Sequence, residues 1–546
     1  MRLPLLVAVL ALGVSPLEAQ DVPRFGEMIE VRRAQAEVVV TDSKGSPVAG
    51  LQPSDFLLFE AGQPVEITNF SEVRDDRIIT PTGTATRGAD SSAAPERRIV
   101  IIIDNDSIPT IERNQVLDSA RKLVASFGKS DLVMIATWNR GMKLAVPFTN
   151  DQAVLADAID VLAKQSSSAA LEEMSRKVTN SRIQSELSTA LLLRSSIADA
   201  YTKAISHARA SAEEVRNRQE NKVAGLRSMI ATLSGTSGRK AVVFLGRSLP
   251  QHPALETFLY ADEVFRPHLP TLRGHLEGTR ISQVPLHEEL ARYANASDVA
   301  FYPIFVGEVD SSSAENQQRS SQQIEFADFT NSASSMQMLA EMTGGAALHA
   351  TNNYDRAFAM VRRDLSSYYS IAWKPLGEPG AESRVEVRMK NLDLQVRFRS
   401  THREKSFEEQ TGERVIANLF HTPEGMRSAA SLVTGTPKRQ RRGRYSIPIQ
   451  VRIPLDAVTL LPDDQGLSGE FCVWVVVAND RFDQSELSTQ CQPVSVGDPA
   501  TTPRRAHWTY DLELLVRQGA NIVSIGVQDR ATGEISYART TVKAGG

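Results

Sequence analysis

Two carboxylates and a hydroxyl stand close together directly after a short apolar run. Asp104, Asp106 and Ser107 follow Ile99–Ile103, which are five consecutive β-branched residues. Acidic side chains held this close together are unfavourable unless a cation, a helix N-terminus or an arginine neutralises them. The chemistry predicted for this group is therefore the binding of a positive charge, with Asp104, Asp106 and Ser107 as candidate binding residues.

The apolar run that precedes this group leaves no polar face. Such a strand is buried on both sides, in the middle of a parallel sheet that helices cover. Similar runs at 131–138, 240–245 and 299–305 are separated by helical patterns. This alternation predicts an α/β fold with a doubly wound, mostly parallel sheet. In such sheets ligands bind just beyond the carboxyl ends of the central strands, where Asp104 stands.

Other segments predict further units around this sheet. No glycine or proline occurs from Phe148 to Ala224, and apolar residues recur there at helical spacing, which indicates a helical insertion. The insertion is either a specificity cap over the strand ends or a helical addition with a solvated face. Short alternating strands with turn signals predict a β unit before the sheet and an immunoglobulin-like β-sandwich after it. The expected order is a signal peptide at 1–19, a small β unit at 20–75, a linker at 76–97, the α/β domain at 98–376 with its insertion at about 165–234, a β-hairpin at 377–400, a linker at 401–440 and the sandwich at 441–546.

The N-terminus has the pattern of a secretory signal. Arg2 is followed by the apolar run Leu3–Val14 and by a small-residue cleavage site before Gln20. No later run is apolar for long enough to span a bilayer, so we expect no transmembrane segment in the mature chain and a periplasmic or secreted location. The net charge of -4 argues against a nucleic-acid partner.

The only cysteines, Cys472 and Cys491, lie in one β-rich region. In an exported protein such a pair predicts a local disulfide. The alternative is two buried thiols in neighbouring strands.

Several motifs together carry a resemblance to a known family. They are Val39–Gly45 with Asp55-Phe56, the strand that ends at Asp104, Gly238–Val243, Thr343–Gly345 and Ser367–Ser370. The α/β unit resembles a von Willebrand factor type A domain, and with its outer segments the chain is similar to the bacterial VWFA-related family first described from acidobacteria. The resemblance covers most of the mature chain. It implies an exported binding or cell-adhesion protein without a known catalytic activity.

The resemblance also implies a metal site, which this chain carries in a degenerate form. Type A domains bind a divalent metal through Asp-x-Ser-x-Ser after the first strand, together with a distant Thr and Asp, and Mg²⁺ suits such oxygen ligands. The first Asp matches Asp104, but the serine positions read Asp106 and Ile108. Ser166–Ser168 are candidates for the distant Thr, and the distant Asp position reads Gly246–Ser248.

Three arrangements are open for the acidic pair. Asp104 and Asp106 could still hold Mg²⁺ with water molecules. Arg247 could instead reach the pair and replace the cation, because a guanidinium fits a carboxylate closely. In the third arrangement Arg247 points into water and Asp104 caps the next helix. We prefer the second and accordingly expect no cofactor.

The expected function is non-enzymatic recognition of a protein or matrix partner in the envelope, through the strand-end face of the α/β domain. The rival functions are an envelope hydrolase that uses Asp104 and Asp106, and a purely structural envelope component. His287-Glu288 lacks the second histidine of a zinc-protease helix, and the chain has no Gly-x-Ser-x-Gly elbow. The sequence therefore offers no motif for these two hydrolase chemistries.

Overall fold

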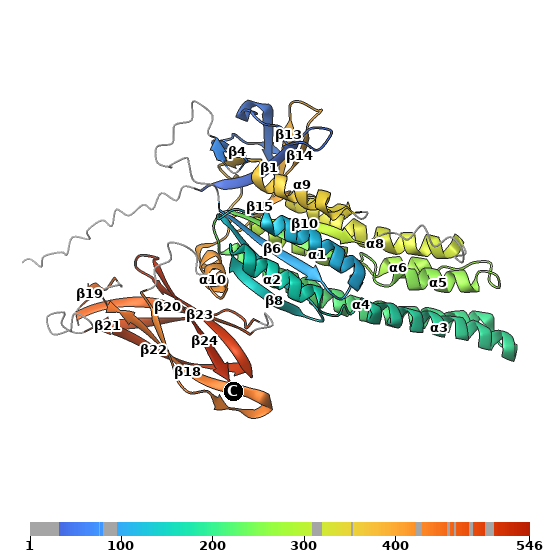
Figure 1. Ribbon diagram of the computed structural model, residues 1–546. Coiled ribbons are helices and arrows are strands. Elements are labelled where there is room, and N and C mark those ends of the chain that lie inside the picture. Colours follow the sequence, from blue (N-terminus) through green and yellow to red (C-terminus); the bar gives the residue numbers. More distant parts are fainter. Residues whose placement is uncertain are drawn as a thin grey trace, which may run out of the picture.

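The computed structural model describes residues 32–75, 77–79, 96–307, 319–350, 353–420, 429–455, 459–463, 466–479, 484–496 and 507–545. The expected signal peptide at 1–19 and most of the linker at 76–97 lie outside these residues. The described chain forms a helix-covered, parallel-rich sheet with antiparallel β-structure on either side of it (Figure 1).

The central sheet has six strands, and its first strand in the chain is β6 (Arg97–Asp104). From edge to edge the sheet contains β11 (Leu348–Ala350), β10 (Val299–Val306), β9 (Arg239–Gly246), β6, β7 (Asp131–Trp138) and β8 (Met142–Thr149). All neighbouring pairs are parallel except β7 and β8. The prediction of a mixed α/β fold with a parallel-rich sheet is therefore confirmed.

Both faces of β6 are buried, as its apolar run requires. Ile99, Ile101 and Ile103 pack on one face, and Val100 and Ile102 pack on the other. The helices on the first face are α1 (Thr110–Ala125), α2 (Gln152–Ala163) and α9 (Tyr354–Ser366). Those on the second face are α4 (Ile197–Ser234), α7 (Val284–Ala296) and α8 (Arg319–Thr343). The chain leaves β6 toward β7 and returns on its other side as β9, so a topological switch point lies at the carboxyl end of β6.

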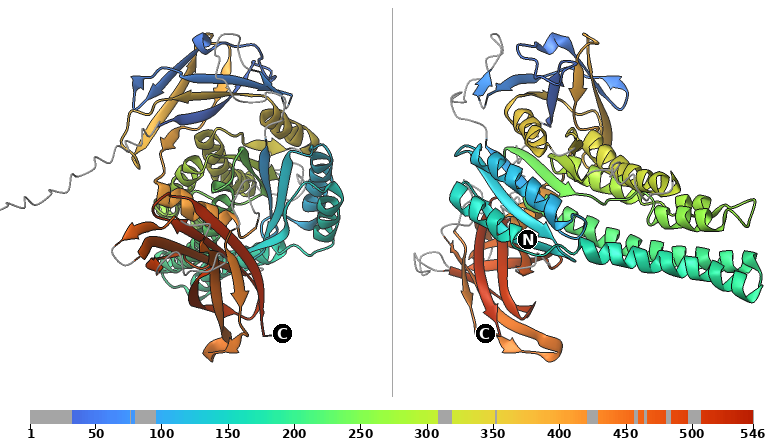
Figure 2. Two further views of the ribbon diagram at one scale, coloured as in Figure 1. Left: turned by 90° about the vertical axis from the view of Figure 1, so that its left-hand side faces the viewer. Right: turned by 45° about the vertical axis from the view of Figure 1, so that its right-hand side comes forward.

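The predicted insertion is a long helical hairpin. α3 (Ala169–Leu193) and α4 run side by side away from the carboxyl ends of the strands (Figures 1 and 2). The hairpin shares an apolar core with α5 (Leu255–Phe265) and lies near α6 (Gly274–Arg280). It extends beyond the sheet, and its sheet-proximal part lies over the strand ends.

The β unit near the N-terminus is built from two distant parts of the chain. β1 (Ala34–Thr41) pairs with β12 (Tyr368–Trp373), and β2 (Phe56–Glu60) pairs with β13 (Glu382–Met389). The remaining strands are β3 (Gln63–Pro64), β4 (Asn69–Arg74), β5 (Arg77–Ile79), β14 (Gln395–Arg397) and β15 (Thr401–Arg403).

Two predicted boundaries are therefore wrong. Residues 368–376 do not extend the α/β sheet, and 377–400 is not a hairpin, because β13 pairs with β2 and β15 while β14 pairs with β1. The physical reason is a shared core, in which Phe56 and Phe70 pack against Tyr369. Neither part of the chain could bury these side chains alone.

The predicted linker at 401–440 is also wrong in part. It contains α10 (Phe407–Ala417), which a Ser406 capping box begins. Val415 and Phe420 join the apolar cluster that contains Met229 of α4 and Trp474 of the C-terminal region. This segment therefore connects the helical layer to the last part of the chain by packing.

The C-terminal region contains two antiparallel sheets that share one apolar core. One contains β16 (Ser431–Thr434), β17 (Lys438–Arg439), β18 (Arg444–Pro454) and β22 (His507–Arg517). The other contains β19 (Leu461–Asp463), β20 (Gly466–Asn479), β21 (Ser488–Val496), β23 (Gly519–Asp529) and β24 (Ile535–Ala544).

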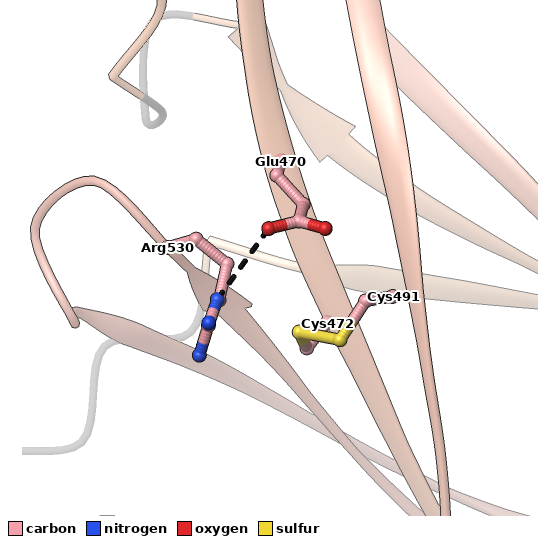
Figure 3. The surroundings of a disulfide bond; sticks show 4 residues. All are labelled: Glu470, Cys472, Cys491 and Arg530. Carbon is pink, nitrogen blue, oxygen red and sulfur yellow. Dashed lines mark ion pairs between the residues drawn. A yellow bond between two sulfur atoms is a disulfide. The ribbon is translucent and has the colours of Figure 1, made fainter.

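The predicted disulfide is confirmed. Cys472 of β20 and Cys491 of β21 stand opposite each other in register, with an S–S distance of 2.01 Å (Figure 3). Nearby, Glu470 forms an ion pair with Arg530 at 3.5 Å. A disulfide fits an exported protein. Among the described residues, no helix has both the length and the apolar character needed to cross a bilayer.

Candidate functional site

The turn between β6 and α1 is organised by the carboxylate of Asp104. This side chain is fully buried. Its Oδ2 accepts a hydrogen bond from the hydroxyl of Ser107 at 2.7 Å, and its Oδ1 accepts one from the backbone N–H of Asp106 at 3.3 Å. Asp104 thus holds the turn that carries the other candidate residues.

The positive charge on Asp104 is the ammonium group of Lys222, from the interior of α4. Nζ lies 2.7 Å from Oδ2 of Asp104, and the two side chains are 3% and 0% exposed. Nζ also donates to the carbonyl oxygen of Ser248 at 3.3 Å. The ammonium therefore stands at the switch point of the sheet, where the degenerate motif had predicted a cation or its replacement.

Arg247 is not the residue that neutralises Asp104. Its backbone N–H donates to the hydroxyl of Ser107 at 3.0 Å, while its guanidinium lies against Gly307. The predicted guanidinium pairing with Asp104 and Asp106 is therefore wrong, although a cationic side chain does occupy that place. The physical reason is that α4 crosses the strand ends and brings its lysine to Asp104.

A sequence signal for Lys222 existed. Gln219, Lys222, Val223 and Leu226 are spaced so that they share one face of a helix, and all four are buried. A lysine in an otherwise apolar stripe needs a buried partner. The pattern predicts that Lys222 has an acidic partner, but it does not predict which acidic residue that is.

Asp106 is also fully engaged. Its Oδ1 accepts a hydrogen bond from the hydroxyl of Ser168 at 2.6 Å, and its Oδ2 accepts one from the backbone N–H of Arg140 at 2.8 Å. Ser168 is the N-cap residue of α3 and one of the candidates for the distant Thr. Asp106 thus anchors the start of the insertion, whereas Asp104 anchors its second helix.

A second buried cation, Arg113 of α1, supports the same turn. Its guanidinium donates to the side-chain oxygen of Asn105 and to the carbonyl oxygen of Gln165, both at 2.6 Å. The Asn105 amide in turn donates to the carbonyl oxygen of Ser166 at 2.9 Å. No local motif in the sequence marks Arg113 as part of this turn. These bonds fix the segment through which the chain enters the insertion.

The residues around Asp104 do not suit Mg²⁺. A divalent cation on Asp104 would lie against the ammonium group of Lys222, and both carboxylates already have donors. Within the described residues, no group of three or more His, Cys, Asp or Glu side chains is placed to hold a metal. We therefore assign no metal to Asp104 and Asp106.

A cavity of about 580 Å³ lies beside this turn, between the helical hairpin and α5 and α8. Ser107, Arg247 and Ser248 line it, whereas Asp104 and Asp106 do not. Of the predicted binding residues, only Ser107 and Arg247 thus face a space that a ligand could enter. The charged side chains that complete the lining are Glu172, Glu173, Arg176, Arg218, Glu256, Glu325 and Asp328.

Three acidic side chains of this cavity have raised pKa values. Burial and the Asp328 carboxylate raise the pKa of Glu256 to about 8, although the Arg176 guanidinium opposes the shift. Burial likewise raises the pKa of Asp328 and of Glu172 above their usual values. The cavity wall therefore holds carboxyl groups that gain from a nearby positive charge.

Comparisons with known proteins indicate similar solved structures only. No protein-family model matches the chain, and none of the curated proteins matches it. An aerotolerance-related membrane protein from Bacteroides fragilis is 11% identical, with a TM-score of 0.24 over 49% of this chain and 98% of that chain. BatB from Bacteroides thetaiotaomicron is 9% identical, with a TM-score of 0.23 over 49% and 98%. A von Willebrand factor type A protein from Catenulispora acidiphila is 9% identical, with a TM-score of 0.23 over 89% and 75%. TM-scores this low carry no argument about function.

Proposed function

We propose that this chain is an exported, non-enzymatic binding protein that recognises a protein or matrix partner of the envelope. In this proposal it is a divergent member of the bacterial VWFA-related family with an immunoglobulin-like sandwich at its C-terminal end. The partner binds at the carboxyl ends of the central strands, in the cavity next to Ser107. Lys222 takes the place of the metal ion of other type A domains.

The ion pair between Lys222 and Asp104 is the observation that carries this proposal. It supplies the positive charge from within the fold, so recognition does not depend on a bound cation. The cavity beside it lies at the switch point where open α/β sheets bind their ligands.

The burial of Asp104 and Asp106 counts against the hydrolase alternative. A general acid or base must come within hydrogen-bond reach of the substrate. Both carboxylates are buried outside the cavity lining, and their oxygens accept hydrogen bonds from within the chain. They stabilise the turn and the insertion, which suits a binding protein.

Capture of the partner from native envelope tests the proposal. The immobilised mature chain should retain the same partner with and without EDTA. Ser211→Trp places a bulky side chain of α4 in the cavity and should weaken capture at least about tenfold, whatever the charge of the bound group. Ser206→Trp is the matched control, because Ser206 also lies on α4 but is exposed and does not line the cavity.

Loss of capture in EDTA would contradict the replacement of the metal by Lys222. Equal capture by the wild type and Ser211→Trp would contradict the assigned face. Specific cleavage of an envelope substrate by the purified chain would support the hydrolase instead.

A further inference from the structure

The lining of the cavity next to Ser107 contains more acidic than basic side chains. It has five carboxyl groups and three guanidinium groups. Two of the guanidiniums already have acidic neighbours: Arg176 lies 2.5 Å from Glu173, and Arg218 lies 2.9 Å from Glu214. Arg176 reaches Asp328 only at 3.8 Å. The arginines of the chain therefore neutralise the wall incompletely.

Glu256 is a poorly compensated carboxyl group in this wall. It is half-buried near the start of α5, and no ion pair to it occurs within the described residues. The one side chain that donates a hydrogen bond to its carboxyl group, among the described residues, is the hydroxyl of Thr257, at 3.4 Å. The charged group that most raises its pKa is the acidic side chain of Asp328 in α8. A positive group between α5 and α8 would relieve this repulsion.

Gln219 gives an independent indication of a ligand. This residue of α4 lines the cavity and is only 4% exposed. Its side-chain oxygen has no hydrogen-bond donor among the described residues. A buried amide oxygen without a donor destabilises a fold by about 1–3 kcal/mol, so it is normally satisfied. The cavity thus contains a hydrogen-bond acceptor to which an N–H or O–H group of a ligand could donate.

One class of ligand meets both requirements. A guanidinium or ammonium group supplies N–H donors for Gln219 and a positive charge for Glu256 and Asp328. An anion would be repelled by the acidic side chains, which outnumber the basic ones. An apolar group would leave the side-chain oxygen of Gln219 without a hydrogen-bond donor. The cavity volume of about 580 Å³ is in the range of sites for small ligands and exceeds the needs of one side chain.

We infer that this cavity binds an ammonium or guanidinium group, presented either by a basic side chain of the partner or by a free small amine. The first source rests on the proposed function and identifies the chemistry of its partner. In that case the partner contributes the positive charge and this chain the acidic groups, whereas in metal-mediated capture the partner contributes an acidic side chain.

Calorimetric titration of the full mature chain with agmatine, which carries both cationic groups, tests this inference. Agmatine should bind the wild type, whereas the dianion glutarate should not. Glu256→Gln and Gln219→Leu should each weaken agmatine binding at least about tenfold. Glu263→Gln should leave it unchanged, because Glu263 is on the same helix as Glu256 but does not line the cavity.

A competition experiment separates the two sources and the two proposals. If agmatine displaces the captured partner from the immobilised chain, the cation is a side chain of that partner. If agmatine binds and the partner stays, the cation is a free amine. If agmatine does not bind, or binds Glu256→Gln and Gln219→Leu as well as the wild type, the inference is overturned even when partner capture persists.

Discussion

One ammonium group stands at the carboxyl end of β6, where the sequence predicted that a positive charge binds. Removing two charges from water is unfavourable, and a buried pair offsets this only when further hydrogen bonds satisfy its atoms. Here Ser107 and the carbonyl oxygen of Ser248 supply those bonds to Asp104 and Lys222. The pair therefore ties α4 to the end of β6, and loss of either partner leaves an uncompensated buried charge.

The first prediction concerns this pair. Lys222→Met should lower the free energy of unfolding by about 3–5 kcal/mol, because Asp104 stays buried without its cation. Lys203→Met, at an exposed position of the same helix, should change it by less than about 0.5 kcal/mol. Urea unfolding measures both.

The double variant Asp104→Asn/Lys222→Met completes the test. Its loss should be smaller than the sum of the two single losses by about 1–3 kcal/mol. Additive losses would show that the pair is not coupled.

The second prediction concerns Glu256 and pH. Its pKa of about 8 in the folded chain lies above its usual value, so its stabilising contribution is present at low pH and is lost as the pH rises toward 8. The facing groups are Asp328, which raises this pKa, and Arg176, which lowers it. Glu256→Gln cannot ionise, so its melting temperature should exceed that of the wild type by a margin that grows from pH 5 to pH 8.

Thermal unfolding across this pH range provides the measurement, with Glu263→Gln as the control that follows the wild type. Parallel curves for the wild type and Glu256→Gln would exclude a raised pKa at Glu256.

At the scale of elements, the close contact between α4 and α10 joins the helical layer to the C-terminal sheets. Gly235 ends α4, and a Cβ atom there would lie 2.4 Å from the carbonyl oxygen of Glu413 in α10. Lys405 adds polar contacts, since its Nζ donates to Ser234 at 2.7 Å and to Glu413 at 2.5 Å. The absence of a side chain at Gly235 thus sets the distance between the two helices.

The third prediction is that Gly235→Ala forces α10 away from α4. Overpacking at such a contact destabilises a fold by about 1–3 kcal/mol. Gly141→Ala is the control, since a Cβ at Gly141 would meet nothing within 4 Å. Differential scanning calorimetry should show a lower melting temperature for Gly235→Ala only. Equal melting temperatures of the two variants would contradict this prediction, because α10 could then move away from α4 without a loss of stability.

The elements that the sequence predicted well are those with strong local patterns. The all-apolar run Ile99–Ile103 predicted a strand with two buried faces, and the long stretch without glycine or proline predicted the helical insertion. The strand pairing of β1 with β12 had no local signal, because antiparallel partners can lie anywhere in the chain. For the same reason Lys222 could be recognised only by its apolar surroundings, while its partner Asp104 depended on the tertiary fold.

For the whole molecule, the disulfide is the one covalent link between distant residues in the described chain. It joins Cys472 and Cys491, 19 positions apart in sequence, and Cys472 is buried while Cys491 is exposed. Closing a loop of this size restricts the unfolded chain, which stabilises the fold by about 3 kcal/mol.

The fourth prediction follows from this link. Dithiothreitol should lower the stability of the wild type by about 2–4 kcal/mol in the transition that reports on the C-terminal sheets. The Cys472→Ala/Cys491→Ala variant should unfold at the lower value with or without the reductant. Wild-type stability that does not respond to complete reduction would show that the crosslink is not needed.

The order in which the strands are synthesised has a consequence for assembly. Gln35 of β1 and Ser370 of β12 are 335 residues apart, yet their side chains form a hydrogen bond in the same sheet. At ordinary rates of translation, roughly 20 to 70 seconds separate the appearance of these strands. During that interval Val38–Val40 presents an unpaired apolar edge, which is a template for aggregation. The two partners of β1, which are β12 and β14, are thus both missing during most of the synthesis of the chain.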